Sequence, residues 1–129
     1  MNYLLCFCLL LFTACERRSP SDLIKRCEQI TGFDRLGEYV INVKSLHSAS
    51  EGEYFLLTLS KKLEPELIKN LETKGFSAWA RGGIEYGPIN EGWDTSDDLI
   101  YSMIKGARET RLVAFSKTKG VLYIIYREK

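Results

Sequence analysis

Two strand-type runs in the last third of the chain are apolar on both faces. They are residues 111–115 and 121–126, and the polar, glycine-ended stretch 116–120 separates them. Runs rich in β-branched and aromatic residues, joined by a short loop of turn residues, predict an antiparallel hairpin. A strand that is apolar on both faces is typically covered on both faces. The chain is therefore expected to build a sheet around this hairpin.

An earlier pair of runs also has the sequence patterns of strands. Residues 38–44 alternate between apolar and polar side chains, which indicates a half-buried strand. Its inward-facing positions are expected to be Tyr39, Ile41 and Val43. Residues 53–59 are apolar on both faces and are typical of a central strand. The polar stretch 45–52, with the lone histidine His47, is predicted to be the hairpin loop between the two strands.

The first helix is expected over residues 22–31. Ser21 is placed to cap its amino end, and Gly32 is placed to end it in a left-handed conformation. One apolar stripe of this helix contains Leu23, Ile24, Cys27 and Ile30. The thiol of Cys27 is therefore expected to face the core as a small hydrophobic group.

A second helix is expected over residues 65–74, because proline suits its first position and Gly75 can terminate it. In that register the cap predicts a contact between Leu71 and Phe76. The strand-type residues after the cap make 54–81 a candidate strand-helix-strand crossover, for which parallel pairing is the default.

A third helix is expected to begin near Ser96, with Thr95 and Asp98 as a capping box, and to end at Gly106. Its apolar positions are Leu99, Ile100 and Met103. Helices and strand pairs therefore alternate along the chain. They predict an α+β fold: one small domain with a mixed, mainly antiparallel sheet of four to six strands and about three helices packed on it.

The first fifteen residues differ from the rest. Residues 3–14 carry no charge, consist mainly of Leu, Phe and Cys, and precede the charged, proline-containing segment 16–20. The run is shorter than the roughly 20 residues that a transmembrane helix needs, and it matches the apolar region of an export signal. Its last five residues, Leu-Phe-Thr-Ala-Cys at 11–15, resemble the lipobox of a bacterial lipoprotein signal peptide.

The resemblance implies that residues 1–14 are a signal peptide that is removed, and that the sulfur of Cys15 then carries lipid such as palmitate. Residues 15–21 would be a lipidated tether, and residues 22–129 would form the domain. The implied location is the bacterial cell membrane or outer membrane, with the domain facing the periplasm. Cys27 would then be the one free thiol of the mature chain.

The rest of the sequence offers little support for catalysis. It contains no GxSxG or HExxH motif, no phosphate-binding glycine loop and no calcium-loop spacing. Helix capping accounts for the acidic cluster of Asp94, Asp97 and Asp98. The 18 Lys and Arg residues are interspersed with 17 Asp and Glu residues, a pattern that does not predict a nucleic-acid partner. We therefore expect a non-enzymatic protein with no metal or other cofactor.

The best candidate for a binding surface is the glycine-rich segment 82–94, which is compatible with either a tight hairpin or a long irregular loop. Arg81, Tyr86 and Trp93 supply the residue types that dominate interface hot spots. Trp79 and Trp93 are equally compatible with a place in the core, because tryptophan is usually highly buried.

These features predict a small lipid-anchored envelope protein that binds a protein partner, of the inhibitor, immunity or accessory-subunit type. The alternative is an envelope enzyme or a small-molecule-binding domain that uses the acidic and aromatic segment 81–98.

Overall fold

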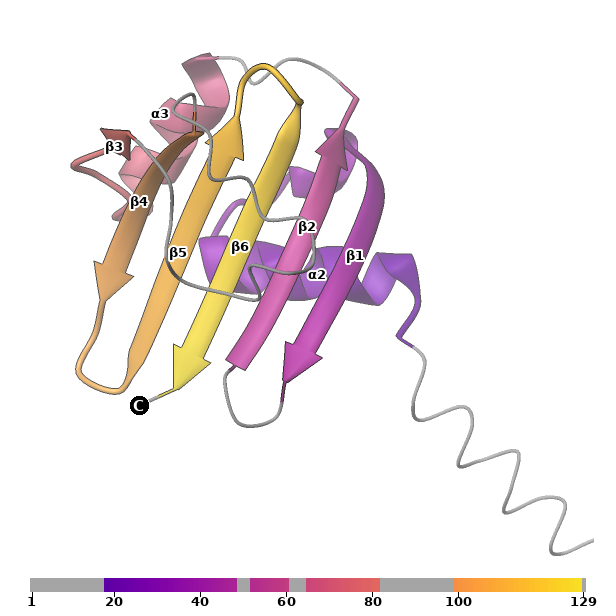
Figure 1. Ribbon diagram of the computed structural model, residues 1–129, viewed down its shortest axis with the longest axis horizontal. Coiled ribbons are helices and arrows are strands. Elements are labelled where there is room, and N and C mark those ends of the chain that lie inside the picture. Colours follow the sequence, from indigo (N-terminus) through magenta and orange to yellow (C-terminus); the bar gives the residue numbers. More distant parts are fainter. Residues whose placement is uncertain (1–17, 49–51, 61–64, 82–98, 129) are drawn as a thin grey trace, which may run out of the picture.

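The computed structural model of the chain describes residues 18–48, 52–60, 65–81 and 99–128. Its described strands form one six-stranded sheet in the order β1-β2-β6-β5-β4-β3, and every neighbouring pair is antiparallel (Figure 1). The strands are β1 (Val40–Ser48), β2 (Gly52–Leu59), β3 (Ala80–Arg81), β4 (Leu99–Lys105), β5 (Glu109–Ser116) and β6 (Val121–Glu128).

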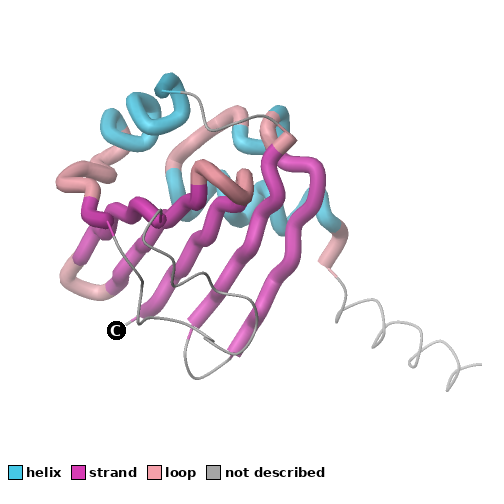
Figure 2. The backbone as a smooth tube through the Cα atoms, turned by 45° about the horizontal axis from the view of Figure 1, so that its top comes forward, coloured by secondary structure: helices cyan, strands magenta, loops and turns pink. Residues whose placement is uncertain are grey.

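Two α-helices accompany the sheet: α2 (Pro20–Thr31) and α3 (Pro65–Thr73), with a short 3-10 helix, η1 (Leu36–Glu38), after α2. Figures 1 and 2 show these helices together on one face of the sheet. An α+β fold with a mainly antiparallel sheet is therefore confirmed. The predicted number of about three helices is wrong, since the described residues contain two α-helices.

Apolar side chains lie on both faces of the sheet, as the sequence pattern of its strands predicts. The helix-side core includes Cys27, Phe55, Leu57, Leu71, Phe76, Val113, Phe115, Leu122 and Ile124. The second-face core consists of Tyr54, Leu99, Leu112, Ala114, Tyr123 and Ile125. The central strands β2, β5 and β6 contribute to both cores, because successive residues of a strand point to opposite faces.

The predicted C-terminal hairpin and the central position of residues 53–59 are confirmed. Strand β6 pairs with β5 on one side and with β2 on the other. Each of these three strands therefore has a hydrogen-bonded neighbour on both edges.

The prediction of a third helix is wrong for those of its residues that the structure describes. Residues 99–105 form β4, and Leu99 enters the second-face core while Ile100 enters the helix-side core. A short run that is apolar on both faces satisfies helical and strand spacing alike. Pairing of β4 with β5 along the whole length of β4 decides the outcome in favour of a strand. The proposed cap residues Thr95, Ser96 and Asp98 lie outside the described residues.

The predicted parallel crossover over residues 54–81 is also wrong. The strand after α3 is only two residues long, Ala80–Arg81, and it pairs antiparallel with β4 at the far edge of the sheet. Strand β6 occupies the position beside β2. Because β6 is long and apolar, it pairs with β2 over more residues than the short strand β3 could. Ala78, with a φ of 55°, turns the chain before β3 begins.

The first strand departs from simple alternation. Its pairing with β2 shifts register between Val40 and Asn42, which places an irregularity at Ile41. As a result, Val40 and Val43 pack against the helix-side core, whereas the side chain of Ile41 is 67% exposed. A β-bulge inserts one residue into a strand and so changes which face the following side chains occupy. The prediction that Ile41 faces inward is therefore wrong.

Two smaller boundaries also differ from the sequence analysis. Helix α2 starts at Pro20 and is capped by Ser19, whose Oγ accepts a hydrogen bond of 3.2 Å from the Asp22 N–H, so Ser21 is not the cap. Strand β1 continues to Ser48, so His47 belongs to a strand and pairs with Glu53. The predicted loop 45–52 is shortened accordingly.

The helix ends behave as predicted. Gly32 ends α2 with a φ of 74°, and Gly75 follows α3 with a φ of 99°. The Phe76 N–H donates to the Leu71 carbonyl at 3.0 Å, and the Gly75 N–H donates to the Glu72 carbonyl at 3.1 Å. These two bonds form a complete Schellman motif. Leu71 and Phe76 are both buried in the helix-side core, so their predicted association is confirmed.

The thiol of Cys27 lies in the helix-side core, where its exposure is 0%. Burial raises the pKa of this thiol to about 12, because the thiolate would lose its hydration there. The prediction that Cys27 faces the core is therefore confirmed.

We expect Cys27→Ser to lower the free energy of unfolding by about 1–3 kcal/mol, because the serine hydroxyl would be buried in apolar surroundings. Urea denaturation measures the change, and Cys27→Ala, which adds no hydroxyl, is the control. The native protein should also resist thiol reagents. Rapid native-state labelling, or a disulfide-linked dimer on a non-reducing gel, would contradict the buried position.

Candidate functional site

A pocket of about 180 Å³ lies at one end of the second face of the sheet. Its lining residues within the described part of the chain come from three adjacent strands and are Met103, Lys105, Thr110, Leu112, Ile125 and Arg127. They form two neighbouring rows across β4, β5 and β6, which the strand register aligns. One row is apolar, Met103, Leu112 and Ile125, and the next row is polar, Lys105, Thr110 and Arg127. The pocket therefore combines a hydrophobic wall with two cations.

Arg127 is the most unusual side chain of the pocket. Its Nη2 donates a hydrogen bond of 2.8 Å to the Tyr54 hydroxyl, and its guanidinium carbon lies 5.7 Å from the centre of the Tyr54 ring. Its Nε is buried and has no hydrogen-bond partner among the described residues. Leaving a buried N–H unpaired typically costs about 1–3 kcal/mol.

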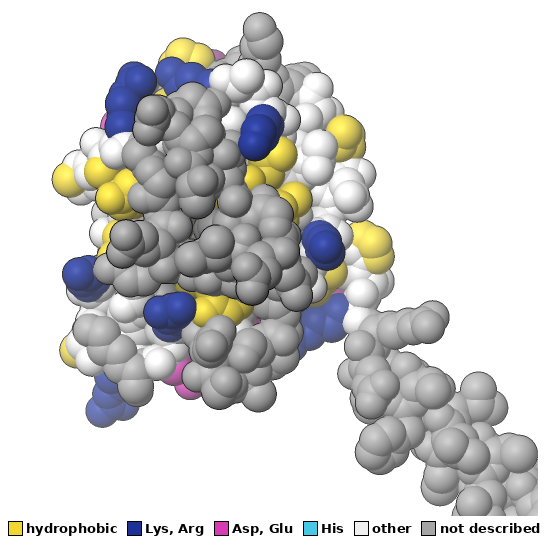
Figure 3. Space-filling view, in the orientation of Figure 1, with side chains coloured by type: hydrophobic (Ala, Val, Ile, Leu, Met, Phe, Trp, Pro, Cys, Tyr) yellow, Lys and Arg dark blue, Asp and Glu magenta, His cyan; other side chains and the backbone are white. Residues whose placement is uncertain are grey.

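Among the described residues, no Asp or Glu lines this pocket. Figure 3 looks onto the same face and shows hydrophobic side chains with Lys and Arg side chains around them. A pocket with two cations and a hydroxyl favours an anionic ligand, because the positive charges attract it and all three groups can donate hydrogen bonds.

On the opposite face, an ion-pair network ties α2 to the same end of the sheet. Arg26 of α2 donates from Nε and Nη2 to the carboxylate of Glu53 at the start of β2, with an Nη2 to Oε1 distance of 2.8 Å. Arg18 also lies near Glu53, with an Nη1 to Oε2 distance of 3.7 Å. The hydrogen bond with Glu53 raises the pKa of Arg26. The start of the described chain is therefore held at the start of β2.

The network continues onto the neighbouring strands. The guanidinium carbon of Arg26 lies 4.9 Å from the centre of the Tyr126 ring, and the Tyr126 hydroxyl donates to Glu109 at 2.9 Å. Glu109 also accepts hydrogen bonds from Arg111, and these bonds lower the pKa of the Glu109 carboxyl. Arg111 Nη1 in turn donates to the Ile30 carbonyl at 3.3 Å. These groups satisfy one another, so the network is better explained as structural than as a binding site.

A second hollow, of about 230 Å³, lies between the loop after α2 and helix α3. Asp34, Arg35, Asn70, Thr73 and Lys74 are among its lining residues, and all five are exposed. Both charge signs are present there. Unlike the pocket beside Arg127, this hollow contains none of the buried unpaired side-chain atoms found among the described residues.

The structure describes only part of the predicted binding surface. Arg81 is exposed in β3, at the edge of the sheet. Tyr86, Trp93 and the glycine-rich segment that contains them lie outside the described residues, as does Cys15. Trp79 is half-buried: its ring lies 5.5 Å from that of Phe115, and its Nε1 donates to Glu72 at 3.1 Å. Trp79 therefore packs at the margin of the core.

The sequence analysis missed the pocket beside Arg127. Lys105 and Thr110 face each other across the β4–β5 hairpin, but Arg127 is 17 residues beyond Thr110, so the register of β5 with β6 is needed to bring it to them. The available signal is the alternation of β6, in which Arg127 follows Ile125 and Tyr123 on one face. That alternation places a cation directly beyond an apolar row.

Comparisons with protein-family models, with curated proteins and with solved structures gave no match to this chain. In the part of the chain that the structure describes, no helix is long and apolar enough to cross a membrane. The described residues likewise contain no group of three His, Cys, Asp or Glu side chains suited to hold a metal ion.

Proposed function

We propose that the chain is a small lipid-anchored protein of the bacterial cell envelope that acts as a non-enzymatic protein-binding module, of the inhibitor, immunity or accessory-subunit type. In this proposal, lipid on Cys15 holds the domain at the membrane and the domain faces the periplasm. The observation that carries the proposal is the separation between the start of the described chain, which lies near Glu53, and Arg81, which lies toward the other end of the sheet.

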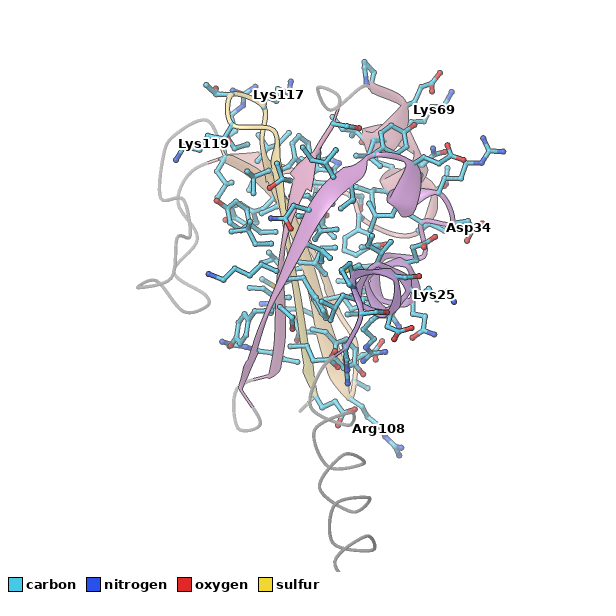
Figure 4. All side chains as sticks on the ribbon, turned by 90° about the vertical axis from the view of Figure 1, so that its right-hand side faces the viewer. Lys25, Asp34, Lys69, Arg108, Lys117 and Lys119 are labelled. Atoms are coloured by element: carbon cyan, nitrogen blue, oxygen red, sulfur yellow. The ribbon has the colours of Figure 1, made fainter. Side chains whose placement is uncertain are left out.

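The described chain starts with Arg18, which lies beside Glu53 at the start of β2. Arg18, close to Glu53, is three residues from Cys15, a separation of at most roughly 11 Å for a fully extended chain. Lipid on Cys15 would therefore bring this end of the sheet against the membrane surface. Figure 4 shows the exposed Arg108 at this end, with Lys69, Lys117 and Lys119 at the opposite end.

Arg81 lies toward the far end. It pairs with Ile100, and the register continues across the sheet through Phe115 and Leu122 to Leu57. Leu57 is four residues beyond Glu53 along β2, which corresponds to roughly 13 Å. An exposed arginine on a short edge strand is thus turned toward the periplasm, where a protein partner is accessible. Arginine is also one of the residue types that dominate interface hot spots.

The experiment is chemical cross-linking of the full chain in membranes, followed by capture and comparison of its cross-linked partners. We expect Arg81→Ala to lower the yield of a specific cross-linked species by about tenfold, the effect of losing one well-formed charged contact. Its melting temperature should change little, since Arg81 is exposed.

Arg108→Ala is the matched control, because it removes an equally exposed arginine at the tether end of the sheet. It should leave the yield of the cross-linked species unchanged. If Arg81→Ala leaves the captured species unchanged, or if both variants reduce it equally, Arg81 is not the contact and this assignment is wrong.

A further inference from the structure

We propose that the pocket beside Arg127 binds the phosphate group of an anionic phospholipid from the membrane to which the chain is anchored. The ligand carries a phosphate group next to an apolar chain. A phospholipid of the membrane surface is the ligand that we propose. The orientation of the pocket toward the membrane rests on the proposed anchoring through Cys15.

The polar row of the pocket matches a phosphate group. Arg127 and Lys105 flank Thr110 on adjacent strands, so the Cα atoms of the two cations lie roughly 10 Å apart across the sheet. Long side chains on either side of a hydroxyl can converge on one anion across such a gap. Lys105 and Arg127 both line the pocket, so their charged groups are the donors on which a phosphate oxygen would be held. Arginine and lysine are the side chains best suited to phosphate, because both stay charged and both donate several hydrogen bonds.

The apolar row explains why a lipid is preferred over a free ion. Met103, Leu112 and Ile125 form the wall next to the cations, and Leu112 and Ile125 continue into the second-face core. Inorganic phosphate would gain nothing from this wall. Leu112 and Ile125 are only 1% and 2% exposed, so the first methylene groups of a phospholipid would pack chiefly on the half-buried Met103, where they lose contact with water.

The net positive charge of this end of the sheet favours contact with an anionic membrane surface. Its described basic residues are Arg18, Arg26, Lys105, Arg108, Arg111 and Arg127, and its described acidic residues are Asp22, Glu53, Glu109 and Glu128. Six cations minus four anions give +2 for this end, whereas the full chain has a net charge of +1. Basic groups held next to anionic lipid are attracted to it within about one Debye length.

The test is a titration of the full chain in dodecyl maltoside micelles, which contain no phosphate. The chain has two methionines, Met1 and Met103, so a methyl-labelled methionine reports on the pocket. We expect the Met103 methyl resonance to shift saturably as phosphatidylglycerol is added to the micelles. Inorganic phosphate at the same concentration should leave it unchanged.

Variants identify the groups responsible. We expect Arg127→Gln to raise the half-saturation point about tenfold, because a charge-assisted hydrogen bond is lost. Lys105→Gln removes a cation from the exposed side of the pocket, and it should weaken binding in the same direction even if Arg127→Gln disturbs folding. The matched control is Lys69→Gln on the exposed face of α3, which removes the same charge and should leave the titration unchanged.

Three results would overturn the inference: no saturable shift of Met103, an equal effect of Lys69→Gln, or an equal shift with inorganic phosphate, which would indicate a free phosphate as the ligand. The titration does not require lipid on Cys15, because the phosphatidylglycerol is added to the sample. If the anchoring or the Arg81-dependent capture fails, this titration can therefore still be interpreted. If the titration fails, the anchoring and the capture experiments can still be interpreted.

Discussion

Phe115→Ala is expected to lower the free energy of unfolding by about 3–5 kcal/mol, the usual cost of truncating a buried aromatic side chain. Phe115 has 0% exposure and lies on β5, between β4 and β6. Its ring meets that of Trp79 at 5.5 Å with an interplanar angle of 63°, an edge-to-face contact that alanine would remove. Urea denaturation monitored by tryptophan fluorescence measures the loss.

Ile41→Ala is the control for this prediction. It also removes a large apolar side chain from the sheet, but at a position that is 67% exposed beside the irregularity of β1. We expect a change of no more than about 0.5 kcal/mol. Equal losses in the two variants would show that β1 is bulge-free and that Ile41 faces the core, as the sequence alternation alone predicts.

Cys15→Ser is expected to abolish lipid attachment, because serine lacks the sulfur that would carry the lipid. The wild-type chain should incorporate a fatty-acid analogue and sediment with membranes. The variant should accumulate as an unlabelled precursor that retains residues 1–14. Metabolic labelling followed by electrophoresis distinguishes the two forms by label and by size.

Cys27→Ser is the matched control for acylation, since it replaces the buried thiol and leaves Cys15 in place. It should label as the wild type does. Equal labelling of the wild type and the Cys15→Ser variant would contradict acylation at Cys15.

Much of the sheet is predictable from local patterns in the sequence. The hairpin of β5 and β6 combines two long apolar runs with a short polar turn, and no other element competes for those residues. The cap after α3 is equally local, because Gly75 and Phe76 define it within one turn of the helix. Sequence patterns confined to a few neighbouring residues predict the structure correctly here, because the tertiary contacts favour the same conformation.

The errors arise where tertiary contacts decide between local alternatives. Residues 99–105 fit a helix and a strand equally well, and the exposed edge of β5 selects the strand. The bulge at Ile41 exchanges the two faces of β1, which alternation cannot reveal. The pocket depends on the register of β4, β5 and β6, so the alternation within β6 alone does not reveal it.

In the anchored protein, we expect the end of the sheet with Arg127 to face the membrane. Paramagnetic relaxation by gadolinium-labelled lipid headgroups tests it on the full chain in lipid nanodiscs, with the Met103 and Leu99 methyl groups as reporters. These two residues stand four positions apart on β4, roughly 13 Å, with Met103 nearer the tether end. We predict strong broadening of the Met103 signal and weaker broadening of the Leu99 signal. Stronger broadening at Leu99, or equal broadening at both, would contradict the orientation and with it the account of how this protein meets the membrane.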